Sequence, residues 1–195
     1  MTLKERCLDW FVGNLPWFIA CFVFAGIAHI VSVLAMPRLA PKDAFARMER
    51  LTPLHRTALL PATTPGGANP PFEDPALVQG ACRYNLAQGP LRLTAALPPD
   101  ALTLLSFHAR FGQVYYSMTD RSATRGKLDV LLLTRQQLDA VEVNDEDELP
   151  QELRIPAPTN EGFILIRALA ALPGDRADAQ RRVLAVTCAL EPESN

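Results

Sequence analysis

The sequence predicts a mainly β protein: an antiparallel β-sandwich-like domain with one or two short helices, preceded by a single transmembrane helix. Three observations lead to this fold class. An uncharged apolar stretch occupies residues 15–36. After residue 76, short apolar runs follow one another at close intervals, which is typical of a sandwich or barrel-like sheet. A segment rich in proline and glycine, residues 61–75, separates the two parts.

The apolar stretch at 15–36 is long enough to cross a membrane. About 22 residues rise roughly 33 Å as a helix, which matches a hydrocarbon core about 30 Å thick. We expect Asn14 to cap the start of this helix, Pro16 to occupy its first turn and Pro37 to end it. Residues 1–14 then form an N-terminal tail, and the span is interpreted as an uncleaved signal anchor.

Two segments connect the anchor to the domain. Residues 37–60 predict a juxtamembrane helix, because Phe45, Met48 and Leu51 recur at three-residue spacing. Such a helix could lie on the membrane or pack on the domain, and its length does not decide between them. Residues 61–75 contain five prolines and two glycines, which predict an extended tether.

The β-rich domain is expected at 76–190. Its predicted strands lie at 77–86, 91–96, 102–109, 113–118, 128–133, 152–155 and 163–168. The continuous apolar run at 128–133 is typical of a strand buried on both faces. Asp175 is expected to cap a late helix that runs through Val183, and residues 183–190 either extend that helix or form a last strand.

Several motifs between Tyr115 and Leu184 occur in a specific order. They are Tyr115-Tyr116-Ser117-Met118, Asp120-Arg121, Gly126, the strand 128–133, Ile155-Pro156-Ala157-Pro158-Thr159-Asn160-Glu161-Gly162, Phe163-Ile164-Leu165-Ile166-Arg167 and Gly174-Asp175. In this order they resemble a widespread bacterial family, the domain of unknown function number twelve-fifty-four. Larger members of that family resemble two consecutive β-sandwich domains behind a secretion signal. This chain resembles a short membrane-anchored branch, which implies a second membrane-anchored β-domain protein as a possible partner.

The resemblance also bears on location. Basic residues follow the apolar stretch more often than they precede it, which by itself would place the domain in the cytoplasm. Long domains, however, translocate regardless of such a bias. The resemblance implies export, so we expect a single-pass protein of the bacterial inner membrane with a periplasmic C-terminal domain. The family has no agreed catalytic residues, so the resemblance implies none here.

Four residues of these motifs have a physical interpretation of their own. Thr159-Asn160 follows two prolines and predicts a corner in which the Asn side chain bonds the neighbouring backbone. Arg167 is expected to point away from the core or to pair with Asp120 or Asp175. We favour these structural roles over a binding site.

Candidate sites for chemistry are few. Tyr115, Tyr116 and Arg121 form a candidate ligand-binding group near a sheet edge, for a saccharide or a lipid headgroup. Ser106 and His108 share one face of a strand, but no Gly-x-Ser-x-Gly motif accompanies them, and we assign no catalytic residue. We therefore incline toward a protein that is not an enzyme.

Metal ligands and cysteines complete the candidates. Two histidines lie outside the apolar stretch and no Cys-x-x-Cys occurs, so we expect no metal site and no cofactor. The acidic run at 145–148 lacks the spacing and glycine of a calcium loop. Cys82 and Cys188 either form a disulfide between the first and last strands of an exported domain, or remain two buried thiols.

Composition excludes one class of function and the motifs rank the others. The formal net charge is -2, and basic residues alternate with acidic ones, so we expect no nucleic-acid partner. The leading hypothesis is a membrane-anchored envelope protein that serves as a protein-interaction or assembly subunit. The alternatives are a module that binds a saccharide or lipid headgroup and, third, a hydrolase-like enzyme around Ser106 and His108.

Overall fold

The computed structural model describes residues 3–39, 44–62, 74–98, 102–123, 125–144 and 152–191. The chain divides into two compact units, Met1–Pro41 and Lys42–Asn195. Most of the predicted tether at 61–75, and the acidic run at 145–148, lie outside the described residues.

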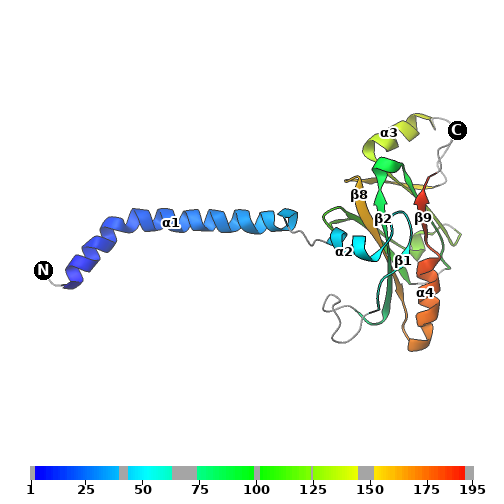
Figure 1. Cartoon of the computed structure of the whole chain (residues 1–195), viewed down its shortest axis with the longest axis horizontal. Helices are drawn as coiled ribbons and strands as arrows, with labels where there is room; N and C mark the ends of the chain where they lie inside the picture. Colours follow the sequence, from blue (N-terminus) through cyan, green and yellow to red (C-terminus); the bar gives the residue numbers. More distant parts are fainter. Residues whose placement is uncertain are drawn as a thin grey trace. The chain divides into compact units, whose positions relative to one another are not determined.

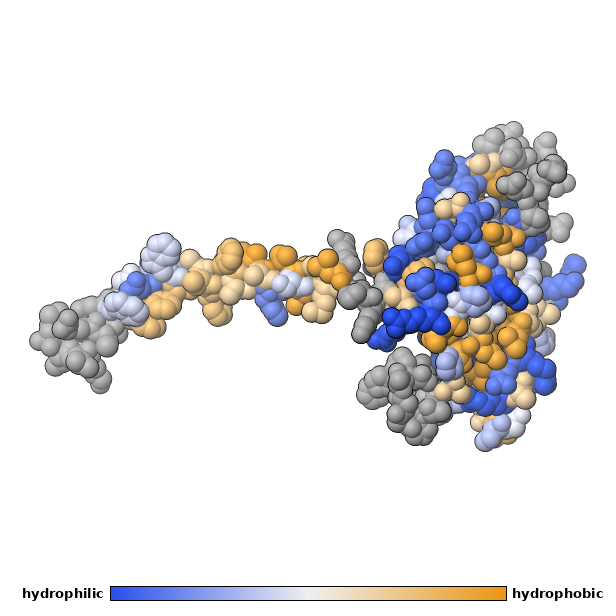
Figure 2. Space-filling model, viewed as in Figure 1, coloured by the Kyte–Doolittle hydropathy of each residue, from blue (hydrophilic) through white to orange (hydrophobic). Residues whose placement is uncertain are grey.

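The first unit is a single long helix, α1 (Leu3–Leu39) (Figure 1). Its segment Trp10–Met36, 27 residues long, is apolar enough to span a membrane, and none of it is buried. Figure 2 shows apolar residues along this helix. Asn14 lies inside the helix and does not cap it, because its Nδ2 donates to the carbonyl of Trp10 one turn earlier, at 2.8 Å. The helix also continues past Pro37 to Leu39.

The second unit is built on two facing β-sheets, with strand orders β1-β2-β8-β4-β5 (sheet A) and β7-β6-β3-β9 (sheet B). Its strands are β1 (Ala58–Leu59), β2 (Leu77–Asn85), β3 (Leu91–Ala96), β4 (Thr103–Ala109), β5 (Val114–Thr119), β6 (Lys127–Thr134), β7 (Leu153–Ala157), β8 (Glu161–Leu169) and β9 (Thr187–Leu190). Every neighbouring pair is antiparallel except β6 and β7. The predicted fold class, mainly β after an apolar N-terminal helix, is confirmed.

Helices cover parts of both sheets. They are α2 (Ala44–Leu51), α3 (Arg135–Asn144) and α4 (Arg176–Leu184), with short 3-10 turns η1 (Leu86–Gln88), η2 (Asp120–Ser122) and η3 (Pro173–Asp175). Between the sheets lies one apolar core that both supply, with Phe107 and Ile164 from sheet A and Leu93 and Leu132 from sheet B fully buried. Burying each such side chain stabilises the fold by about 1.5–3 kcal/mol.

Strand β6 is buried on both faces, as its continuous apolar run predicted. Alternate residues enter the core, whereas Leu131 and Leu133 point to the other face and pack against Leu138 of α3. The sequence interpretation missed this helix, although a capping box marks its start. The amide of Gln137 donates to Thr134 Oγ1 at 3.1 Å, and the amide of Thr134 donates to Gln137 Oε1 at 2.8 Å.

Residues 44–60, which we call the strap, pack on the sandwich. Phe45 of α2 is only 6% exposed, and the guanidinium groups of Arg83 and Arg110 lie 5.7 and 4.2 Å from its ring centroid. Arg83 also donates to the carbonyl of Thr52 at 3.1 Å and pairs with Glu49 at 3.3 Å. The juxtamembrane helix is therefore shorter than the predicted 37–60 and is held by the domain.

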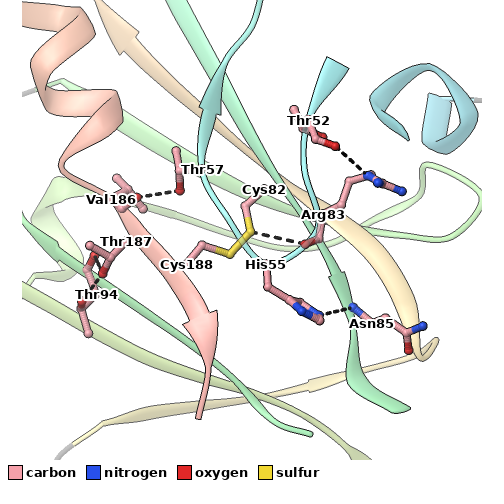
Figure 3. Close-up of a disulfide and its surroundings, with 10 residues drawn as sticks. All are labelled: Thr52, His55, Thr57, Cys82, Arg83, Asn85, Thr94, Val186, Thr187 and Cys188. Atoms are coloured by element: carbon pink, nitrogen blue, oxygen red, sulfur yellow. Dashed lines mark hydrogen bonds between the residues drawn. A yellow bond between two sulfur atoms is a disulfide. The ribbon is translucent and has the colours of Figure 1, made fainter. Parts of the chain in front are cut away.

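One edge of the sandwich is covalently closed. A disulfide joins Cys82 of β2 to Cys188 of β9, with Cα atoms 6.6 Å apart, and so connects the two sheets (Figure 3). The strap crosses the same edge, because Thr57 Oγ1 donates to the carbonyl of Val186 at 2.6 Å. We call this edge, formed by β1, β2, β9 and the strap, the closed edge. The pairing of the two cysteines decides between the alternatives that the sequence left open.

Helix α4 packs against β2 and β8 beside this edge. Gly80 permits the close approach, because a Cβ there would collide with the side chain of Val183. Asp175 precedes α4 but gives it no side-chain cap, since its Oδ2 accepts the amide of Leu172 at 3.0 Å. The helix ends at Leu184, and the last strand, β9, follows after a short turn.

Candidate functional site

Strand β5 is an unprotected edge of sheet A. Among the described strands it pairs only with β4, so one side of its backbone has no strand partner. Its sequence, Val-Tyr-Tyr-Ser-Met-Thr, contains no charged residue and no proline. Val114 is 56% exposed and Tyr116 is 38% exposed. Free N–H and C=O groups beside exposed apolar side chains make such an edge a template for another strand.

The other sheet edges in the described part of the chain are shielded. Strand β1 has only two residues, and β9 has four and belongs to the closed edge. Strand β7 contains Pro156, which cannot donate a hydrogen bond, and its Arg154 pairs at 2.9 Å with Glu152, the residue before the strand. Proline, charge and shortness are the usual ways in which proteins blunt strand edges. Strand β5 has none of these three devices, although it contains one β-bulge, at Tyr115.

A bulge turns Tyr115 into the domain. The pairing of β4 with β5 shifts after Phe107, so Tyr115 is an extra residue between two paired positions. The hydroxyls of Tyr115 and Tyr84 lie 3.1 Å apart, and Tyr84 donates its hydrogen to the carbonyl of His108 at 3.1 Å. Tyr115 must therefore donate to Tyr84. Gly162 leaves room for this pair, because a Cβ there would collide with the Tyr84 hydroxyl.

The two tyrosine hydroxyls are withdrawn from solvent. Burial raises the pKa of Tyr84 to about 12, against the effect of its hydrogen bonds, and burial also raises the pKa of Tyr115. Tyr116 lies edge-on to Phe107, with ring centroids 5.9 Å apart, and stays partly exposed. The three residues predicted to bind a ligand are thus divided: Tyr115 is engaged inside the domain, whereas Tyr116 and Arg121 are exposed.

Ser106 and His108, adjacent on one face of β4 as expected, are in hydrogen-bond contact. Ser106 Oγ lies 3.0 Å from His108 Nε2, and His108 Nδ1 lies 3.1 Å from the carbonyl of Gly112. A carbonyl can only accept, so Nδ1 carries the hydrogen and Nε2 accepts from Ser106. Burial lowers the pKa of His108, which favours the neutral ring. A hydroxyl that donates its hydrogen bond to a neutral imidazole is the arrangement found between a catalytic nucleophile and its general base.

The surroundings of this pair argue for a structural role. Ser106 is 5% exposed, and its Oγ also lies 3.5 Å from the carbonyl of Leu165. The imidazole stacks on Phe163 with ring centroids 4.5 Å apart and an angle of 11° between the planes. A backbone carbonyl, rather than a carboxylate, orients the ring. A substrate would have to reach a hydroxyl that the sheet already encloses.

The corner between β7 and β8 forms where it was predicted, but a different side chain organises it. Thr159 Oγ1 accepts the amide of Arg110 at 3.1 Å and donates to the carbonyl of Glu161 at 2.7 Å. Asn160 contributes its backbone carbonyl, which accepts the amide of Leu86 at 2.8 Å. The hydroxyl of Thr159 therefore makes the bonds to the backbone that were expected of the Asn160 side chain.

Arg167 forms no ion pair with either predicted partner in the described structure. Asp120 Oδ2 accepts the amide of Leu102 at 3.0 Å, and Asp175 bonds the backbone before α4. Arg167 is half-buried on β8. Burial of His108 is the main cause of its lowered pKa, and the positive charge of Arg167 lowers that pKa further. Within the described residues, no group of three or more His, Cys, Asp or Glu is arranged to hold a metal ion.

The fold is similar to that of a solved structure. The VPA0106 protein from Vibrio parahaemolyticus is similar at a TM-score of 0.53 with 12% identity, and the likeness covers 75% of this chain and 34% of that chain. An uncharacterized protein from Burkholderia cenocepacia gives a TM-score of 0.46 with 12% identity, covering 74% and 36%. Neither the family models nor the curated proteins give a match. The first comparison supports the fold alone, a two-sheet β domain that matches about a third of the Vibrio chain.

Proposed function

We propose that this chain is a single-pass, membrane-anchored protein of the bacterial cell envelope whose β domain serves as an assembly subunit. The open β5 edge carries the proposal, because an uncharged six-residue strand with exposed Val114 and Tyr116 invites strand addition. In this mode the backbone hydrogen bonds supply affinity and the alternating side chains supply specificity.

Two features support a location outside the cytoplasm. Disulfides persist in oxidising compartments such as the bacterial periplasm, and Cys82 and Cys188 are bonded. The apolar segment Trp10–Met36 has the length and composition of an inner-membrane anchor. The resemblance to the domain of unknown function number twelve-fifty-four is in line with export of the domain.

The occupant of the β5 edge that we propose is a strand of a second membrane-anchored β-domain protein. In the solved structure from Vibrio parahaemolyticus, a fold like this one occupies only 34% of a longer chain. Larger members of the resembled family resemble two consecutive β-sandwich domains. A separate protein that supplies such a domain would cover β5 without burying a charge, because the strand has none.

Site-specific photocrosslinking in native membranes tests this function. A photoreactive residue replaces Thr119 of β5 in the full-length chain, and a matched probe replaces Leu172, an exposed residue beside α4. We expect Thr119, and not Leu172, to crosslink to one protein, with the crosslink mapping to a strand of its β domain. Crosslinks only to a second copy of this chain, or none from Thr119, would overturn the proposal.

A second test uses charge to blunt the edge. The double substitution Val114→Lys and Thr119→Lys should release the partner during purification from native membranes, because unpaired charges on an edge oppose strand addition. The control, Leu172→Lys with Leu184→Lys, changes two exposed residues elsewhere and should retain the partner at unit stoichiometry. Retention of the partner by both variants would contradict the assignment to β5.

A further inference from the structure

An open depression of about 480 Å³ lies where three turns of the domain meet. The turns follow β2, connect β4 with β5, and connect β7 with β8. The lining residues that matter here are Asn85, Arg110, Phe111, Thr159, Asn160 and Glu161. A volume of this size falls within the usual range of small-ligand sites, about 300–1,000 Å³.

The floor of this depression is fixed by hydrogen bonds. Glu161 Oε1 accepts Asn85 Nδ2 at 3.3 Å, and Glu161 Oε2 lies 3.6 Å from Arg110 Nε. Asn85 Oδ1 in turn accepts the amide of Ala87 at 3.0 Å. With the Thr159 bonds of the corner, these contacts hold three chain segments together. A site whose polar groups are already placed loses little conformational entropy on binding.

Besides the Glu161 carboxylate, two exposed side chains of the depression are available to a ligand. Phe111, at the tip of the β4–β5 turn, is 52% exposed. Gly112 follows it with φ of +83°, a left-handed conformation that a side chain would strain. Asn160 is exposed, and its carboxamide can donate and accept hydrogen bonds.

We propose that this depression binds a neutral saccharide unit. The Phe111 ring offers an apolar surface to the C–H face of a pyranose, while Asn160 and the Glu161 carboxylate can bond its hydroxyls. An anionic ligand is disfavoured, because the positive charge of Arg110 is balanced by the negative charge of Glu161, 3.6 Å away. None of the lining residues belongs to β5, and the inference does not rest on the assembly function.

Calorimetric titration of the full-length chain tests the inference. The protein is placed in phospholipid nanodiscs, because maltoside detergents carry the same chemistry as the proposed ligand. The probes are the N-acetylglucosamine trimer and maltotriose. We expect saturable binding of at least one of them, weakened tenfold or more by Phe111→Ala and by Asn160→Ala. Leu172→Ala, an exposed residue of another turn, is the matched control and should leave the dissociation constant unchanged.

Three outcomes would overturn the inference. The wild-type chain gives no saturable heat with either trisaccharide; or both depression variants, with unchanged thermal unfolding, bind as tightly as the wild type; or inorganic phosphate competes with the trisaccharide and Arg110→Gln abolishes both. The last result would assign the depression to anions.

Discussion

The two opposite edges of sheet A are built in different ways. At the closed edge, a disulfide, the Thr57–Val186 hydrogen bond and the strap fasten segments that are far apart in the sequence. At the open edge, β5 has β4 as its only strand partner among the described strands, and Val114 is exposed. A fastened edge cannot accept another strand, whereas the open edge can. The comparison separates the part that holds the fold from the part that remains for recognition.

This division has a physical basis. A small sandwich gains stability from cross-links that restrict its unfolded chain. A cross-link that lies away from the binding surface leaves that surface unchanged. Variants at the closed edge should therefore reduce stability and leave the partner bound. Variants along the free side of β5 should do the reverse.

Loss of the disulfide should have the largest effect. Cys82→Ala with Cys188→Ala is expected to lower the free energy of unfolding by about 4 kcal/mol, because the bridge closes a loop with a sequence separation of 106. Urea unfolding of the full-length chain measures it. Reduction of the wild-type protein separates loss of the bond from loss of packed side chains, and Cys21→Ala serves as control. An unchanged midpoint after complete reduction would show that the closed edge does not depend on the bond.

Removal of the strap anchor should rank second. Phe45→Ala is expected to cost about 3 kcal/mol, because it empties a buried aromatic site beneath two guanidinium groups. Hydrogen exchange should report the loss as faster exchange across 44–60, with the sandwich core still protected. Leu51→Ala changes an exposed residue of the same helix and should leave exchange as it is. Equal protection of the strap in both variants would contradict its docking through Phe45.

The smallest effect should come from pH. Burial lowers the pKa of His55 in the strap and of His108 in β4 below the ordinary value of 6.5. As pH falls below 6.5 the unfolded chain takes up protons before the folded one, so stability is complete above that pH and declines as pH approaches the folded pKa values. His55 Nε2 accepts the amide of Asn85 at 3.1 Å, and protonation would break this bond.

Thermal unfolding between about pH 8 and pH 5 measures this dependence. His55→Gln and His108→Gln should each flatten the curve, the first by acting on the strap and the second by acting on β4. If both variants keep the wild-type slope, the acid sensitivity lies in carboxylates elsewhere, and neither the strap nor β4 titrates through its histidine.

Much of the fold could be predicted because its signals are local. The strand predicted at 128–133 corresponds to β6 (Lys127–Thr134), and the strand predicted at 163–168 corresponds to β8 (Glu161–Leu169). Helix α3 was missed because its apolar residues are few, yet Thr134 and Gln137 have the spacing of a capping box. The start of α1 was placed too late because Asn14 and Pro16 resemble a helix start, whereas the helix continues through both.

The candidate site was less predictable. Two residues apart on a strand, Ser106 and His108 had to share a face, but nothing local indicated that the hydroxyl would be enclosed. Tyr115 turned inward because of a bulge, which depends on the register between β4 and β5. The hydroxyl of Thr159 took the role assigned to Asn160 because Arg110, from a distant turn, supplies the amide that it accepts.

The sequence by itself determined the long apolar helix, the abundance of strands and the faces on which alternate residues lie, because these follow from hydrophobic period and residue type over a few neighbours. Only the tertiary structure decided that Cys82 meets Cys188, that the strap docks on the sandwich and that β5 is left as the open edge. Those outcomes depend on strand order and on contacts between residues as many as 129 positions apart, as for Thr57 and Val186. No local pattern in the chain encodes which strand ends up without a neighbour.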